Sequence, residues 1–159
     1  MKTLIRMLSN LFCRPKKEGS IAEEPLKEYK GKIKIDKYVD MGNKKIYNAT
    51  KYLFKTPPEV LDFLNNNTLF WVDEKNGMLG FSTYNRTLLV PLHEVKGIEI
   101  QNMLPGKGPG DASFFICLPN NKILMLSISP VIRDFDKYAE RITEMMGFEV
   151  TFSPEFYNC

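Results

Sequence analysis

Short runs of hydrophobic residues, separated by turn-forming residues, fill the middle of the chain. Each run is rich in Leu, Ile, Val or Phe and has the length of a β-strand. The runs span residues 69–72, 78–81, 87–90, 98–100, 112–118 and 123–128. Asn, Gly, Pro and Asp fill the gaps between them, and Asn76-Gly77 is a strong hairpin signal. This pattern predicts an antiparallel meander of strands.

A helical pattern follows the meander. Ser129 and Pro130 are typical of a helix start, and Gly147 is typical of a helix end. Between them, hydrophobic residues at helical spacing form one narrow stripe: Ile132, Phe135, Ala139, Ile142 and Met146. The sequence therefore predicts an α+β fold that is mostly β. In this fold the meander forms a partly open barrel or a sandwich, capped by a C-terminal helix over residues 130–146.

Two weaker strands and a short helix are predicted before the meander. Residues 32–38 alternate Lys and Ile, which suits an edge strand protected by lysines, and a phosphate-binding patch is the alternative interpretation. Residues 46–54 form a second strand candidate. Thr56 is the expected N-cap of a helix that starts at the prolines after it and ends at Asn65.

Large hydrophobic residues of these elements are expected to form the core. The strands of the meander need cover on both faces where nearly every residue is apolar, as in 114–118 and 123–126. The residues expected to be buried are Trp71, Phe81, Leu88, Ile100, Phe115, Leu124, Phe135 and Ile142.

The first 17 residues form a pattern of their own. On a helix, five hydrophobic residues share one face: Leu4, Ile5, Leu8, Leu11 and Phe12. Five basic residues come before the first acid: Lys2, Arg6, Arg14, Lys16 and Lys17. A short basic amphipathic helix can lie in a membrane interface, so we expect these residues to contact an anionic membrane surface. Docking on the domain, fraying and an export signal are the alternatives, although no small-residue cleavage site follows.

Composition sets the expected boundaries. Residues 15–31 are polar and charged, with Pro and Gly, which is typical of a mobile linker. We therefore expect an N-terminal segment and linker over residues 1–31, a single domain over 32–153 and a tail over 154–159. A total of 159 residues fits one domain.

Overall composition excludes several protein classes. The chain is 43% hydrophobic and 26% charged, which is typical of a folded globular protein, and its net charge of +3 gives no argument for nucleic acid binding. Its three cysteines, Cys13, Cys117 and Cys159, are odd in number and form no CxxC pair. This usage fits a reducing cytoplasm. No hydrophobic run reaches the roughly 18 residues that a membrane-spanning helix needs.

Residues that could carry chemistry are few. His93 is the single histidine, and no Ser or Cys motif accompanies it, so a turn residue is the favoured interpretation. The Gly-rich stretch 106–110 joins two strands and lacks the form of a phosphate-binding loop, although its Lys107 could touch an anionic headgroup or a partner. The acids of the C-terminal helix, Asp134, Asp136, Glu140 and Glu144, are expected to form a solvated face. We therefore expect no catalytic residues, no cofactor and no metal.

One stretch resembles a known family. The segment from Thr87 to Ile100 contains Val90-Pro91-Leu92, then the turn His93-Glu94-Val95, then Ile98-Glu99-Ile100. With the meander and the closing helix, residues 46–147 resemble a bacterial pleckstrin-homology-like domain of the PH/GRAM superfold. The resemblance implies a PH-like binding or scaffold module, often found at membranes, and no phosphoinositide-binding basic motif transfers to this sequence.

The expected function is therefore a non-enzymatic binding or scaffold domain. We expect it in the cytoplasm, peripheral to the inner membrane face through residues 1–17. The alternative is a soluble protein-binding partner of the immunity or antitoxin type, and an enzyme of unrecognised class is the third interpretation. A protein partner is expected and nucleic acid is not, whereas the identity of the partner and the oligomeric state do not follow from the sequence.

Overall fold

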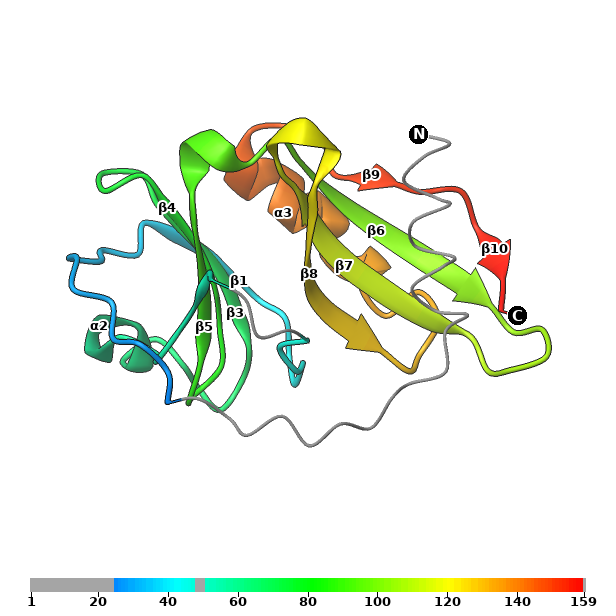
Figure 1. The fold of residues 1–159 in the computed structure, drawn as a ribbon, viewed down its shortest axis with the longest axis horizontal. Helices are drawn as coiled ribbons and strands as arrows, with labels where there is room; N and C mark the ends of the chain where they lie inside the picture. The colour runs from blue at the N-terminus through cyan, green and yellow to red at the C-terminus, as the bar shows by residue number, and fades with distance from the viewer. Residues whose placement is uncertain (1–24, 48–50, 159) are drawn as a thin grey trace.

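The computed structural model describes residues 25–47 and 51–158, most of which belong to two β-sheets (Figure 1). Sheet A has the strand order β1-β3-β4-β5-β2 and is antiparallel throughout. Its strands are β1 (Lys37–Asp40), β2 (Leu53–Phe54), β3 (Leu69–Asp73), β4 (Met78–Ser82) and β5 (Thr87–Pro91).

Sheet B has the order β10-β6-β7-β8, and β9 also pairs with β6. The three long strands are antiparallel, whereas β9 and β10 run parallel to β6. Its strands are β6 (Gly97–Leu104), β7 (Asp111–Cys117), β8 (Ile123–Ser129), β9 (Thr151–Phe152) and β10 (Phe156–Tyr157).

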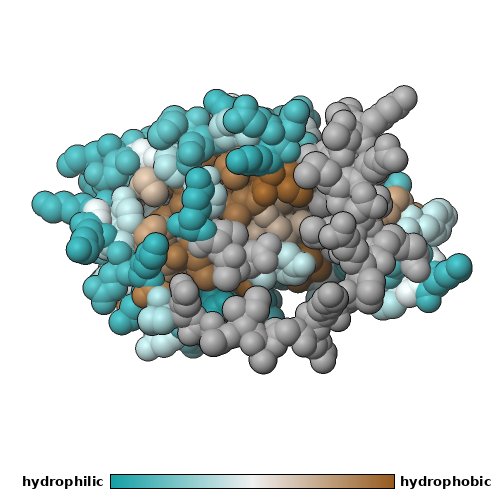
Figure 2. All heavy atoms as spheres, viewed as in Figure 1, coloured by the Kyte–Doolittle hydropathy of each residue, from teal (hydrophilic) through white to brown (hydrophobic). Residues whose placement is uncertain are grey.

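The predicted α+β, mostly β class is confirmed. In the described part of the chain the two sheets do not close into a barrel, so the arrangement is an open sandwich. Helix α3 (Ala139–Met146) packs against the interior between the sheets, as the predicted cap should. Figure 2 shows hydrophobic residues gathered in the middle of the visible face, with hydrophilic residues to their left and above them.

The core consists of three clusters. The largest lies between the sheets and includes Phe81, Phe114 and Phe135. A second cluster, around Trp71, lies on the outer face of sheet A, under helix α2 (Pro58–Leu61) and residues 29–35. A third, around Phe115, lies on the outer face of sheet B. All eight residues predicted to be buried are buried.

The turns between strands are also as predicted. Gly77, at the tip of the β3–β4 hairpin, has a φ of +65°, a conformation that glycine adopts without strain. The β4–β5 turn is closed by the Thr83 N–H, which donates to the Arg86 carbonyl at 2.9 Å.

The C-terminal helix is shorter than predicted. It begins at Ala139 after the 3-10 turn Asp136–Tyr138, not at residue 130. Arg133 has a φ of +62°, and its N–H donates to the Asn102 side chain at 2.9 Å. Asn102 in turn donates to Asp136 at 3.1 Å. The buried Asn102 therefore fixes an irregular turn in a segment that has a helical pattern of apolar residues.

Elements before the meander also differ in extent from the prediction. Helix α2 has only four residues, and Thr56 does not cap it. The Thr56 hydroxyl donates instead to the Thr83 carbonyl at 2.7 Å, which ties the segment to the β4–β5 turn. The strand candidate 46–54 shortens to β2, and residues 48–50 lie outside the description.

Segments at and beyond both predicted boundaries of the domain pair with the sheets. The edge strand predicted over 32–38 is β1, whose bounds are shifted toward Asp40, while Ile33 covers Trp71. Lys27, in the predicted linker, forms a bridge with Phe54. Phe156 and Tyr157, in the predicted tail, form β10 beside β6.

Candidate functional site

Three of the four sheet margins are covered by backbone hydrogen bonds from other segments. Along β2, the Lys55 N–H donates to the Lys27 carbonyl at 2.8 Å. Along β8, the Tyr47 N–H donates to the Leu126 carbonyl at 3.0 Å. Along β6, the short strands β9 and β10 pair with the backbone. Covering a sheet margin in this way prevents unwanted strand pairing.

The fourth margin is strand β1. Within the described ranges, no strand or backbone hydrogen bond lies on its far side from β3. The Met41 N–H donates to the Thr68 carbonyl at 2.9 Å, which sets the alternation of the β1–β3 ladder. In that alternation the N–H and carbonyl of Tyr38 turn away from β3, toward the open margin.

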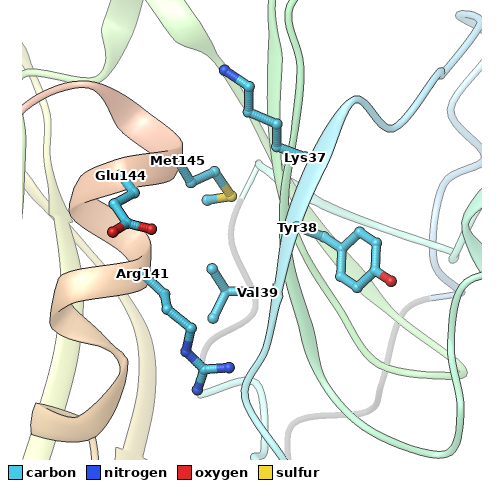
Figure 3. Close-up of a pocket in the computed structure, with 6 residues that line it drawn as sticks. All are labelled: Lys37, Tyr38, Val39, Arg141, Glu144 and Met145. Carbon is cyan, nitrogen blue, oxygen red and sulfur yellow. The ribbon is translucent and has the colours of Figure 1, made fainter.

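A groove lies between this open margin and helix α3. Its cavity volume is about 310 Å³, and its lining residues are Lys37, Tyr38, Val39, Arg141, Glu144 and Met145. We call it the β1–α3 groove. In Figure 3, Val39 and Met145 point toward one another across it, and the Tyr38 ring points to the opposite side of the strand. The groove therefore has an apolar floor beside an open strand edge.

Charged side chains form the rims of the groove. Lys37 pairs with Glu74 at 3.0 Å, with both side chains more than half exposed, so this ion pair contributes little to stability. Arg141 lies 5.4 Å from the centre of the Tyr138 ring, and its exposed guanidinium remains available to an acidic group. Glu144 is the acid on the same rim.

A half-buried ion pair fixes the two walls relative to each other. Lys44, after β1, lies 3.1 Å from Asp134, before α3. Burial acts to raise the pKa of Asp134, but hydrogen bonds from Ser129 and Lys44, with the charges of Lys44 and Lys137, lower it. Asp134 is therefore ionised at neutral pH and holds Lys44 against the turn that leads into the helix.

This pair corrects part of the prediction for the helix acids. Asp134 and Asp136 are not on a solvated face, because Lys44 and Asn102 bind them. Glu140 and Glu144 are exposed, as predicted. The sequence pattern alone did not show that Asp134 and Asp136 bind residues of distant segments, Lys44 and Asn102.

The predicted ligand residue Lys107 lies elsewhere. It is exposed in the β6–β7 loop, and its N–H donates to the Asn158 carbonyl at 3.3 Å. The Asn158 side chain also donates to the Pro109 carbonyl at 2.6 Å. The loop is thus tied to the end of the chain, and Lys107 does not line the β1–α3 groove.

The histidine and the described cysteine lie in the environments that follow. His93 is exposed in the 3-10 turn Leu92–Glu94, and its carbonyl accepts from Lys96 at 3.4 Å. Burial, with the Glu99 carboxylate beside it, raises the pKa of Cys117 to about 12. The Cys117 thiol is therefore protonated at neutral pH and is a poor nucleophile.

Three further predictions concern membrane contact, membrane-spanning helices and metal ions. The residues predicted to contact a membrane, 2–17, lie outside the described part. Within residues 25–47 and 51–158, no helix is long and apolar enough to cross a bilayer. In the same ranges, no cluster of three or more His, Cys, Asp or Glu residues is placed to hold a metal ion.

The groove itself was not predicted. Its floor joins Val39 to Met145, which are far apart in the sequence and lie on elements of different periodicity. The predicted edge strand ended at Tyr38, before Val39, and the predicted helix stripe did not include Met145. Nothing local indicates that these two residues meet at an open strand edge.

Comparison with known proteins gives a family. The model of the PM0294 C-terminal domain matches residues 26–157, and the chain therefore belongs to this family. The matched residues include both sheets and α3, and thus both walls of the β1–α3 groove. The chain matches no curated protein. Family and fold alone do not assign a function, so the function has to be inferred from the site.

Proposed function

We propose that this member of the PM0294 C-terminal domain family, which has an open strand edge, is a non-enzymatic binding domain. It takes an extended segment of a protein partner into the β1–α3 groove, where the segment adds a strand to sheet A. The observation that carries the proposal is the margin of β1, which has no backbone partner among the described residues, unlike the other three margins. The resemblance to PH-like domains supports the same class of function.

The groove chemistry specifies the segment. In an added strand, alternate side chains point to one side, so one of them lies over Val39 and Met145 and should be apolar. Its neighbours meet the rims, where Arg141 and Lys37 favour an acidic residue. Main-chain hydrogen bonds to Tyr38 supply affinity that does not depend on sequence.

A short edge strand with a lysine also has a protective role, since it discourages pairing between copies. The two roles differ in what lies beside the strand. Protection needs no pocket, whereas β1 has an apolar floor formed jointly with α3. This floor favours a specific occupant.

A peptide selection tests the proposal. A phage-displayed library of random linear peptides is selected on the full-length protein, and the selected peptides are measured against variants. Tyr38→Pro removes the outward N–H, and Arg141→Glu reverses the charge of one rim. Both should weaken binding by about tenfold or more, the loss expected for one main-chain hydrogen bond or one charge contact.

The matched control is Lys122→Glu, which makes the same charge reversal at an exposed residue of the β7–β8 turn. Lys122→Glu should bind the peptides as the unchanged protein does. Selected peptides that lose no affinity with Tyr38→Pro and Arg141→Glu would show that the groove is not the binding site. A selection that yields no binding peptide would also count against it.

We further propose a cytoplasmic location at the inner face of a membrane, held by residues 1–17. The support is the basic amphipathic pattern of this segment, together with the unpaired thiol of Cys117 and the odd number of cysteines. The full-length protein should float with anionic liposomes at low salt, and binding should fall as salt rises. A protein that stays in solution with anionic liposomes at low salt would refute this location.

A further inference from the structure

The side of strand β1 that faces away from the groove carries an exposed pair of aromatic rings. Tyr38 lies opposite Trp71 in the β1–β3 register, so its ring is on the outer face of sheet A. Phe63, just after helix α2, packs against it edge to face, with 6.0 Å between the ring centres. Tyr38 is 54% exposed and Phe63 is 44% exposed. We call these two rings the Tyr38–Phe63 pair.

This pair differs from the other contacts between aromatic rings in the described ranges. Each of the others joins two rings that are buried or half-buried. In the Tyr38–Phe63 pair both rings meet solvent, and their contact holds them in a fixed arrangement. Exposed tyrosine rings are frequent at protein interfaces, because the ring is apolar and the hydroxyl can stay in water. The pair therefore has the character of a contact surface.

The pair lies directly beside the open margin of β1. The N–H and carbonyl of Tyr38 point toward that margin, and in Figure 3 its ring and the Val39 side chain point to opposite sides of the strand. Side chains of a strand added here alternate in the same way, so consecutive ones meet the groove and the Tyr38–Phe63 pair in turn. Residues opposite each other in a sheet have Cβ atoms about 4.5–5.5 Å apart, which is close enough for direct contact.

The faces of the two rings are not occupied by cations of the described ranges. There, no lysine or arginine lies over Tyr38 or Phe63, whereas three cationic side chains lie over the Tyr138 ring. The face of a tyrosine or phenylalanine ring attracts a guanidinium or ammonium group. The pair can therefore receive a cation from a partner.

Carboxylates beside the pair favour the same charge. Asp62 is next to Phe63 in the chain and is exposed, and no lysine or arginine of the described ranges pairs with it. Asp40 lies on the same outer face, where its carboxylate accepts hydrogen bonds from the Gly42 N–H at 2.9 Å and the Asn67 side chain at 3.0 Å. Both of these donors are neutral. A basic side chain of a partner complements these acids, and an acidic one is repelled.

We propose that the Tyr38–Phe63 pair is a second subsite for the strand that adds to β1, and that it binds an arginine side chain of the partner. The guanidinium stacks on the rings and lies near Asp62, and its planar shape suits stacking better than an ammonium group does. This inference rests on the proposed function, because it requires the added strand, and it specifies the sequence of that strand further.

The alternation of the added strand gives the order of its residues. The arginine is the direct neighbour, in sequence, of the apolar residue that lies over Val39 and Met145. The acidic residue expected at the rim of the groove is two positions from the apolar one, because it shares its side of the strand. An apolar residue with an arginine next to it is therefore the expected signature.

The sequences of selected peptides give the first test. Random linear peptides selected on the full-length protein should contain arginine directly beside an apolar residue more often than the unselected library does. Phe63→Leu keeps an apolar side chain and removes the ring. Selection on this variant should retain the apolar residue and lose the preference for arginine beside it.

A binding measurement on a matched pair of peptides gives the second test. One selected peptide is compared with a copy in which methionine, which is apolar and uncharged, replaces the arginine. Phe63→Leu and the charge reversal Asp62→Lys should each weaken binding of the arginine peptide by about threefold to tenfold, as loss of a cation–π or charge contact does. Both variants should bind the methionine peptide as the unchanged protein does.

The matched control is Phe152→Leu, which makes the same change at a half-exposed ring of β9, on sheet B. It should leave the binding of both peptides unchanged. Equal losses of the two peptides with Phe63→Leu would assign the ring an apolar or structural role and overturn the proposal.

The remaining outcomes separate this inference from the proposed function. Peptides that lose affinity with Tyr38→Pro and Arg141→Glu but carry no arginine, or that bind Phe63→Leu as tightly as the unchanged protein, would overturn the subsite and leave the groove as the binding site. A selection that yields no peptide sensitive to Tyr38→Pro and Arg141→Glu would overturn both.

Discussion

The outer faces of the two sheets are both buried, but they are covered in different ways. On sheet A, Trp71 lies under Ile33 and Val60, which come from the segment before β1 and from α2. On sheet B, the described residues packed with Phe115 all belong to the strands beneath it. The cover of sheet A comes from separate elements of the domain, whereas among the described residues no hydrophobic side chain of another element packs on Phe115.

The polar groups under the two covers show what this difference means. On sheet A, the Trp71 N–H donates to Ser82 at 2.8 Å, and Ser82, Thr87 and Thr56 are hydrogen-bonded in series at 2.9 and 3.0 Å. On sheet B, the Gln101 amide and the Ser113 hydroxyl are buried without hydrogen-bond partners among the described residues. An unpaired buried polar group costs stability, so the outer face of sheet B is the less well satisfied of the two.

Replacement of the central aromatic residue on each face should have the largest effect. Trp71→Ala should cost roughly 3–5 kcal/mol, as truncation of a fully packed aromatic residue does. Phe115→Ala should cost only roughly 1.5–3 kcal/mol, the value for burying one such side chain, because no hydrophobic residue of another element packs on it in the described ranges. Chemical denaturation measures both costs, and a cost of Phe115→Ala equal to that of Trp71→Ala would contradict the comparison.

Glycines on the two faces provide a matched pair. A Cβ on Gly80 would lie 2.0 Å from the Trp71 ring, whereas a Cβ on Gly97 would lie 3.7 Å from Cys117. Gly80→Ala should therefore destabilise the protein by roughly 1–3 kcal/mol through overpacking. Gly97→Ala should stay within about 0.5 kcal/mol of the unchanged protein. Thermal unfolding of the two variants tests whether the outer face of sheet A is packed more tightly than that of sheet B. Equal effects would contradict this difference.

Asp73 makes the stability of the protein depend on pH, through its hydrogen bond to the segment that covers sheet A. Its carboxylate accepts the Lys34 N–H at 2.8 Å and both the backbone and side-chain N–H groups of Asn76. Burial acts to raise the pKa of Asp73, but these hydrogen bonds prevail and lower it. A folded-state pKa below the unfolded value of about 3.9 means stability that is present above that pH and is lost as the pH falls through the folded pKa.

Asp73→Asn should therefore cost roughly 1.5–3 kcal/mol at neutral pH, the usual contribution of hydrogen bonds to a charged group. The cost should shrink in acid, because the unchanged protein loses the same contribution there. Denaturation curves at neutral and acid pH test this expectation. A cost that is the same at both pH values would assign the role of Asp73 to packing instead.

Gln101→Leu should have the smallest effect, and in the opposite direction. Because the buried amide has no partner among the described residues, replacing it with an apolar side chain of similar size should stabilise the protein by about 1 kcal/mol. The measurement is the midpoint of urea unfolding. A loss of stability would mean that the amide has a partner in solution.

Parts of the fold that depend on neighbouring residues could be predicted from the sequence. The β3–β4 hairpin follows from Asn76 and Gly77, and the strands follow from local alternation. The start of α3 could not be predicted, because Asn102 on β6 holds the turn at Arg133. A hydrogen bond between residues so far apart has no local signal, and it overrides the helical pattern of the segment.

The candidate site was beyond sequence reasoning for the same reason. Val39 lies just beyond the predicted edge strand and Met145 lies outside the predicted stripe, and their meeting at an open margin depends on the order of strands in sheet A. The need for cover on both faces of β7 and β8 was predictable, because nearly every residue there is apolar. The sequence therefore indicated the burial of both faces of these strands and not the residues that lie beside them.

The amide of Tyr38 tests the central claim most directly, that strand β1 is an open edge that accepts a partner strand. The Tyr38 N–H turns away from β3 and has no backbone partner within residues 25–47 and 51–158. Hydrogen exchange of this amide is followed by NMR with and without a peptide selected on the protein. The account predicts fast exchange in the free protein and protection when the peptide binds. Exchange that is slow without the peptide, or that the peptide does not change, would contradict it.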